Sequence, residues 1–103
     1  MRIGIVGGVD RTANLLQSVA AQRGHELELH TGVISGSASA AGLRALVARS
    51  ELVVVVTDVN SHNAVKAARR EARLRNRTLR IVRRLGASQL ATLLEGLNQG
   101  TAA

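Results

Sequence analysis

The sequence predicts a single Rossmann-like α/β domain, a three-layer fold with about four parallel strands and helices on both faces of the sheet. Three observations support this fold class: four short segments with strand character alternate with four amphipathic segments, the 103 residues suffice for one domain, and no repeat or linker divides them. Such alternation gives a parallel sheet, because each helix returns the chain to the same edge. We expect the strand order 2-1-3-4, a domain over residues 1–98 and a frayed tail over 99–103.

The expected strands are short aliphatic runs between turn residues. The strongest lies within Glu51–Thr57 and reads Leu-Val-Val-Val-Val, apolar on both faces, so we place it in the centre of the sheet. The first strand, Arg2–Val6, ends at a Gly-Gly pair. The other two strands are Glu26–His30, which alternates polar and apolar residues, and Leu79–Val82.

Apolar residues three or four positions apart predict four helices. Their ranges are Asp10–Arg23, Ala41–Arg49, Ser61–Asn76 and Ser88–Leu97. The side chains expected to face the sheet are Ala13, Leu15, Leu16, Val19, Ala20, Leu43, Leu46, Val47, Ala64, Val65, Ala68, Leu74, Leu90, Leu93, Leu94 and Leu97. We expect a loop over Thr31–Ala41, because Gly, Ser and Ala dominate that stretch.

Composition limits the core and the chemistry. The chain has no Phe, Tyr or Trp, so its core is aliphatic and thin, and we expect a homodimer in which Ser88–Leu97 supplies apolar contact surface. It has no Cys, which excludes disulfides and thiolate chemistry. No apolar run reaches the length of a membrane span, so we expect a cytoplasmic protein without membrane contact. The formal charge of +7, with 14 Lys and Arg against 7 Asp and Glu, favours anionic partners.

Ligands of open α/β sheets bind beyond the carboxyl ends of the strands. Glycine, histidine, hydroxyl and arginine residues follow the strands of this sequence at that edge. We therefore expect a ligand or cofactor site made by Gly7, Gly8, Arg11, His30, Ser61, His62 and Arg83. His25 falls at the opposite edge and is expected to be a solvated turn residue.

The Gly-Gly pair after the first strand allows two interpretations. Gly7 and Gly8 let backbone N–H groups approach an anion at a helix N-terminus, and Arg11 would hold that anion. Alternatively, the two glycines only make a tight strand-to-helix turn. The segment is neither a G-x-G-x-x-G motif nor a P-loop, so it does not assign a dinucleotide or a nucleoside triphosphate.

The segment after the third strand places His62 at the start of a helix, with Ser61 or Asn60 as its N-cap. His30 and His62 are the candidate metal ligands, and Asp58 would complete a two-histidine, one-carboxylate set that no spacing rule supports. We assign no catalytic residue. Adjacent Ser and His side chains diverge on a helix, and no nucleophile elbow is present.

The third helix is strongly basic. Six cationic residues lie on it or just after it: Lys66, Arg69, Arg70, Arg73, Arg75 and Arg77. They make either a solvated face or a surface for nucleic acid or an acidic partner. Without aromatic side chains, the chain has no platform on which single-stranded bases would stack.

These motifs together resemble a bacterial and archaeal family of short Rossmann-like domains of unknown function. The resemblance covers nearly the whole chain and rests on Gly-Gly with a following Arg, His-x-Gly, Asp-x-x-Ser-His-Asn with a following Lys, and a basic stretch leading into Gly and Ser. The matching residues are Gly7, Gly8, Arg11, His30, Gly32, Asp58, Ser61, His62, Asn63, Lys66, Arg83, Arg84, Gly86 and Ser88. Thr31 departs from the acidic residue usual in the family, and the cysteines of many relatives are missing from the third helix.

We predict a ligand-binding module and not an enzyme of a recognisable class. The resemblance leads us to expect haem, with His30 or His62 as the axial ligand and Arg11 or Arg83 at the propionates. One alternative is a phosphate-bearing metabolite or nucleotide at the Gly-Gly turn, with His62 as a hydrogen-bond partner. A nucleic-acid-binding regulator is a further alternative, and it would show steep salt dependence.

Overall fold

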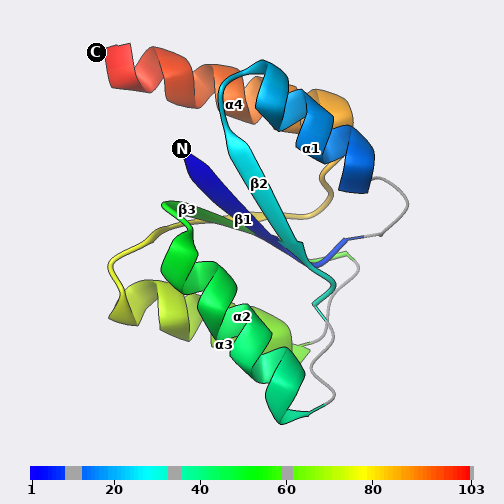
Figure 1. Cartoon of the computed structure of the whole chain (residues 1–103), viewed down its shortest axis with the longest axis vertical. Coiled ribbons are helices and arrows are strands. Elements are labelled where there is room, and N and C mark those ends of the chain that lie inside the picture. Colours follow the sequence, from blue (N-terminus) through cyan, green and yellow to red (C-terminus); the bar gives the residue numbers. More distant parts are fainter. Residues whose placement is uncertain (9–12, 33–35, 59–61, 103) are drawn as a thin grey trace.

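The computed structural model describes residues 1–8, 13–32, 36–58 and 62–102, the last five of these by their backbone alone (Figure 1). Four parallel strands form one sheet in the order β2-β1-β3-β4. They are β1 (Arg2–Val6), β2 (Glu26–His30), β3 (Leu52–Val56) and β4 (Thr78–Val82). The predicted fold class and strand order are therefore confirmed, and the central β3 is buried along its whole length.

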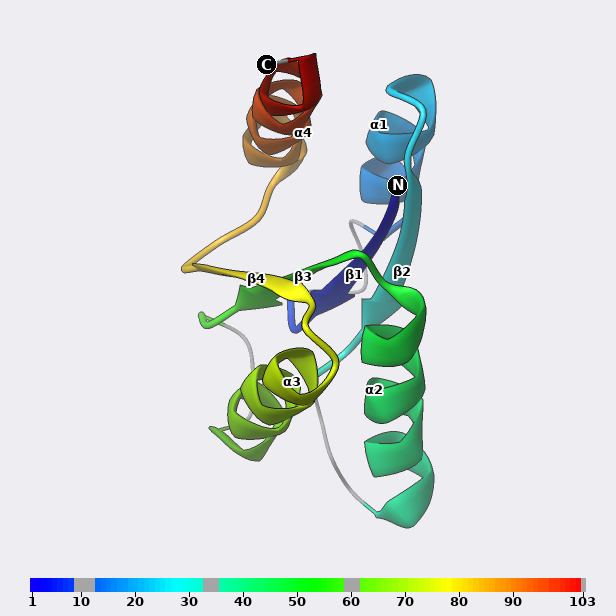
Figure 2. The same ribbon diagram turned by 90° about the vertical axis from the view of Figure 1, so that its left-hand side faces the viewer.

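Two helices cover each face of the sheet. α1 (Ala13–Gln22) and α4 (Ala87–Ala102) lie on one side, and α2 (Ser37–Arg49) and α3 (His62–Leu74) lie on the other (Figure 2). Each pair packs side by side, so the molecule has the three layers of a Rossmann-like domain. Among the described residues, no helix is long and apolar enough to cross a membrane.

The sheet separates two aliphatic clusters. The cluster beneath α1 and α4 contains Ile3, Ile5, Leu16, Ala20, Leu52, Val54, Val56, Leu90 and Leu94. The cluster beneath α2 and α3 contains Val6, Leu43, Leu46, Val47, Val53, Val55, Ala64, Ala68 and Ala72. The contribution of α3 to the second cluster is three alanines at intervals of four residues, which lets this helix approach the sheet closely.

Two leucines expected to face the sheet are exposed instead. Leu15 is 54% exposed and Leu74 is 68% exposed. The buried stripe of α1 runs through Leu16 and Ala20, and Leu15 lies about 100° away from it. The stripe of α3 continues to Ala72, so Leu74 falls on the outer face.

Two helices extend four residues or more beyond the predicted ranges. α2 begins at Ser37, four residues before the predicted start, because Ser39 Oγ accepts a hydrogen bond from Gly36 N–H at 3.2 Å and stabilises the first turn. α4 extends to Ala102, five residues past the predicted end at Leu97.

His25 is buried, at 9% exposure, and the expectation of a solvated turn residue is wrong. α1 ends in a Schellman motif: Gly24 has a φ of 79° and its N–H donates to Ala21 C=O, while His25 N–H donates to Ala20 C=O at 2.9 Å. This motif turns the residue after the glycine back toward the helix. The turn at the amino end of β2 therefore buries the His25 ring.

Candidate functional site

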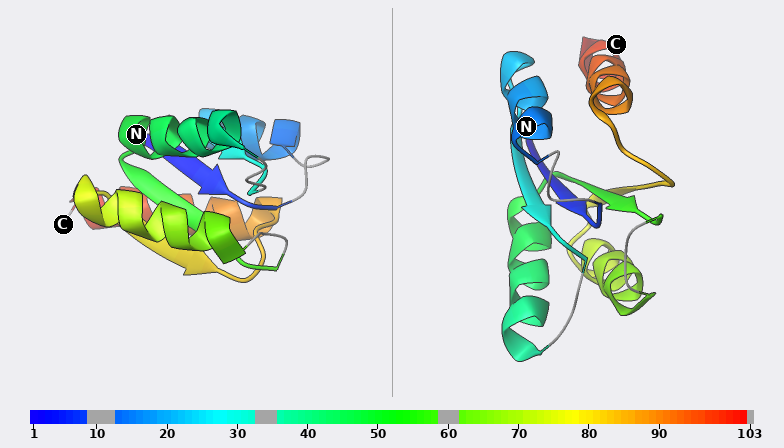
Figure 3. Two further views of the ribbon diagram at one scale, coloured as in Figure 1. Left: turned by 90° about the horizontal axis from the view of Figure 1, so that it is seen from below. Right: turned by 90° about the vertical axis from the view of Figure 1, so that its right-hand side faces the viewer.

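All four strands end at one edge of the sheet, where the predicted site lies (Figure 3). Backbone hydrogen bonds continue past the strand ends and bring neighbouring segments together. Gly7 N–H donates to His30 C=O at 2.8 Å, and Asp58 N–H donates to Arg83 C=O at 3.0 Å. The residue after β1 is thus joined to the end of β2 on one half of the edge, and the residues that follow β3 and β4 are joined on the other half.

The Gly-Gly turn has the backbone conformation that only glycine adopts readily. Gly7 and Gly8 have φ angles of 96° and 100°. A Cβ added at Gly8 would meet no heavy atom of the described residues within 4 Å, so the glycine there serves the backbone conformation, and none of those residues fills the space beside it. No described residue accepts a hydrogen bond from Gly8 N–H. Arg11, Asp10 and Thr12 lie outside the described residues.

His30 has hydrogen-bond partners at both ring nitrogens. Gly32 N–H donates to Nδ1 at 3.0 Å, and Nε2 lies 3.1 Å from Ser39 C=O. Nδ1 is therefore the acceptor and Nε2–H the donor, which defines the tautomer of a neutral imidazole. His30 links the end of β2 to the first turn of α2, and neither nitrogen is left for a metal.

Asp58 forms an ion-pair cluster with the two arginines that follow β4. Arg84 Nε lies 2.6 Å from Asp58 Oδ2, and Arg83 Nε lies 3.5 Å from Oδ1. The hydrogen bond from Arg84 is the main cause that lowers the pKa of the Asp58 carboxyl below its usual range. The Arg83 side chain remains 85% exposed, so it can still reach an anion outside this cluster. Arg84 was not among the predicted site residues, although its place after the fourth strand was a signal for it.

His62 is the first residue of α3 and is exposed at the same edge. Its ring makes no hydrogen bond to the described residues. Ser61 and Asn60 lie outside the described residues. Within the part of the chain that the structure describes, no three His, Cys, Asp or Glu residues are grouped to hold a metal ion, so His30, Asp58 and His62 do not form the suggested set.

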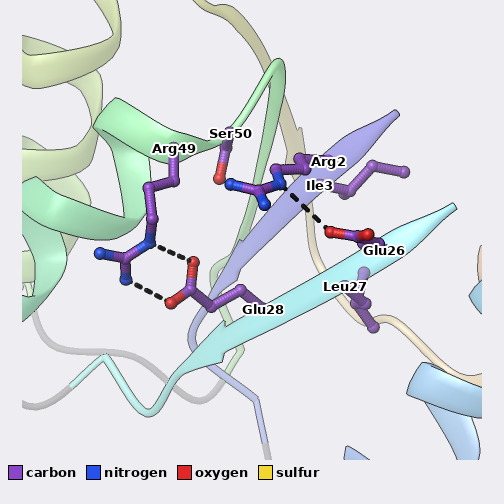
Figure 4. A pocket seen from close by; sticks show the side chains of 7 residues that line it. All are labelled: Arg2, Ile3, Glu26, Leu27, Glu28, Arg49 and Ser50. Atoms are coloured by element: carbon purple, nitrogen blue, oxygen red, sulfur yellow. Dashed lines mark hydrogen bonds and ion pairs between the residues drawn. The ribbon is translucent and has the colours of Figure 1, made fainter.

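A separate hollow of about 310 Å³ lies near the opposite edge, between β1, β2 and the end of α2 (Figure 4). Its charged groups are paired with one another. Arg2 Nε lies 3.1 Å from Glu26 Oε2, and Arg49 Nε donates to Glu28 Oε2 at 3.1 Å. Because each cation already faces a carboxylate, this hollow has no excess charge with which to select a ligand.

Comparison with known proteins identifies one family. The model of a family described as an uncharacterized protein conserved in bacteria (DUF2325) matches residues 2–97 of this chain. Comparison with curated proteins and with solved structures finds no match.

Proposed function

Since this chain belongs to that family of uncharacterized bacterial proteins, its function has to be inferred from the site, and we propose that it is a binding module for a small anionic ligand. The observation that carries the proposal is the Gly8 turn. Its N–H has no acceptor among the described residues, and none of those residues comes within 4 Å of a Cβ built at Gly8. Backbone N–H groups at such a turn bind phosphates and carboxylates. The exposed Arg83 guanidinium supplies positive charge at the same edge.

Within this class we propose haem as the first candidate. His30 does not fit the role of axial ligand, because both of its ring nitrogens are engaged. His62 fits, since its ring is exposed and has no partner among the described residues. An imidazole nitrogen would supply one axial bond to the iron, and Arg83, together with Arg11, would pair with the propionates.

A phosphate-bearing metabolite is the second candidate, and the Gly8 N–H favours it equally. In this case His62 would donate a hydrogen bond to the ligand and would bind no metal. The two candidates differ in colour, which makes them easy to separate. Because the chain has no Trp or Tyr, absorbance above the peptide region comes from a bound ligand alone.

The decisive experiment is a spectrophotometric titration with haemin, beside thermal melts with ATP and inorganic phosphate. Haem binding predicts a shifted Soret band that His62→Ala abolishes and His30→Ala retains. A phosphate ligand predicts an unshifted haemin spectrum and a melting temperature that rises with ATP and falls back in Arg11→Ala. If neither haemin nor phosphate compounds bind, the proposed site is wrong.

We also propose that the chain acts as a cytoplasmic homodimer. Leu15, Leu74 and Ile81 are each about half exposed or more, at 54%, 68% and 48%, and the aliphatic core is thin. Pairing two copies would cover part of this apolar surface. Light scattering that returns a 10.8 kDa particle at micromolar concentration would refute the dimer, and cell fractionation would check the compartment.

A further inference from the structure

Positive charge is distributed unequally between the two helical layers. α1 has no charged residue, and Glu95 is the one charged residue of α4. α3 carries four cations and one carboxylate within 13 residues. Among the described helices, the cations therefore gather on the α2/α3 layer, which does not include the turn at Gly8.

Two of the six cations predicted on this helix and after it have internal roles. Arg75 Nε pairs with Glu71 Oε2 at 3.2 Å, and Arg77 donates to Ala48 C=O at 2.9 Å, which links the end of α3 to α2. Five other cations of this layer make no hydrogen bond or ion pair with any described residue. We call these five residues the α3 cations: they are Lys66, Arg69, Arg70 and Arg73 of α3 and the neighbouring Arg44 of α2.

The α3 cations line a hollow on each flank of the helix. The hollow between α2 and α3 has a volume of about 440 Å³ and is lined by Ala40, Arg44, Lys66, Ala67, Arg70 and Glu71. The hollow between α3 and β4 has a volume of about 240 Å³ and is lined by Arg69, Ala72, Arg73, Arg77 and Leu79. Figure 3, in its left view, shows α2 and α3 side by side on this face. Together the hollows make α3 a ridge with cations on both sides.

The residues that line these hollows indicate which kind of polyanion binds there. An acidic protein partner is anchored by aromatic or large apolar side chains in a pocket, and the apolar residues of the larger hollow are alanines. A membrane-surface helix needs a broad apolar face, which α3 turns toward the sheet. Single-stranded nucleic acid needs stacking platforms, and the chain has no aromatic residue. A duplex backbone needs only regularly spaced cations, and arginine suits it because its planar fork binds phosphate through two donors.

We propose that α3 and the hollows on its two flanks bind the phosphate backbone of double-stranded nucleic acid. Lys66 and Arg73 are seven residues apart, so the cations extend over about 10 Å of the helix. No base-edge contact is needed, and the binding is independent of sequence. This surface shares no residue with the anionic-ligand site, so the proposal stands or falls separately from the proposed function.

The test measures how the affinity for a labelled mixed-sequence DNA duplex changes with salt, by fluorescence anisotropy. If the five α3 cations contact phosphates, the slope of log K against log salt is about −4.5, and a doubling of salt weakens binding about 20-fold. The variant Arg44→Gln/Lys66→Gln/Arg70→Gln is expected to reduce the slope to about −1.8 and to bind about tenfold more weakly or worse at 100 mM salt. Circular dichroism melts establish that it remains folded.

A matched control separates the surface from net charge. Arg2→Gln/Arg23→Gln/Arg80→Gln removes the same number of charges away from α3, and it should keep the affinity and the slope of the unaltered chain. Three results would overturn the proposal. These are an equal loss in both triple variants, a slope near zero for the unaltered chain, and tighter binding to anionic lipid vesicles than to the duplex at equal salt.

Discussion

Gly4 occupies a position in β1 where even one methyl group cannot fit. A Cβ built there would lie 2.3 Å from Leu46 Cδ2 and 2.4 Å from Ser50 Oγ, both of them in buried side chains. Overpacking of this kind costs about 1–3 kcal/mol. Ser50 donates to Leu46 C=O at 2.6 Å, and displacing that hydroxyl adds about 1 kcal/mol. The lower entropy of the unfolded chain offsets about 0.4–1 kcal/mol of this loss.

The net effect of Gly4→Ala is thus a loss of about 2 kcal/mol, which lowers the melting temperature by roughly 8–16 °C in a domain of this size. Thermal melts followed by circular dichroism measure it. The matched control is Gly96→Ala in α4, where an added Cβ meets no atom of the described residues within 4 Å and the melting temperature should rise. The double variant Gly4→Ala/Leu46→Ala should lose less stability than the two single variants combined. A Gly4→Ala protein that melts at or above the original temperature would refute the reasoning.

Three further predictions concern Asn76, Asp58 and His30. Asn76 has a φ of 55° in the Schellman turn after α3. Asn76→Ala should therefore cost about 1 kcal/mol of stability, while Asn76→Gly keeps or raises the melting temperature. Equal melting temperatures of the two variants would contradict this prediction. Because the pKa of Asp58 is lowered in the fold, its pairing stabilises the protein above the ordinary Asp range and is lost as the pH falls through the lowered value. The melting difference from Asp58→Asn should therefore be largest near neutral pH and vanish in acid, and a pH-independent difference would count against the pairing. His30→Ala leaves Gly32 N–H and Ser39 C=O without their partner, which should cost about 1–3 kcal/mol, and an unchanged melt would show that this link is dispensable.

The fold could be predicted because its main signals are independent of tertiary detail. The five aliphatic residues Leu52–Val56 form a strand that tolerates burial on both faces, and this alone placed β3 in the centre. The prediction that Leu74 faces the sheet was wrong, because Leu74 is exposed. Both Leu74 and Ala72 are apolar, and only the close approach of α3 to the sheet decides that the smaller side chain is the buried one.

The edge that carries the candidate site was predictable for the same topological reason, since parallel strands end together. The separate roles of the histidines were not. The partners of His30 depend on where α2 begins, and the Gly, Ser and Ala residues before Ala41 conceal that start from any hydrophobic pattern. The burial of His25 depends on how the turn at Gly24 closes, and a lone glycine does not specify this.

The packing of α4 against α1 affects the order in which the two clusters can form during synthesis. Every member of the cluster beneath α2 and α3 has been made by the time Leu79 joins the chain. The cluster on the opposite face waits for Leu90 and Leu94, which the ribosome adds roughly 1–3 s later. During that interval one side of the sheet, including Ile3 and Ile5, has no covering helix from the C-terminal end. The nascent chain is therefore most exposed to aggregation and chaperone capture before Leu90 and Leu94 are added, on the α1 side of the sheet.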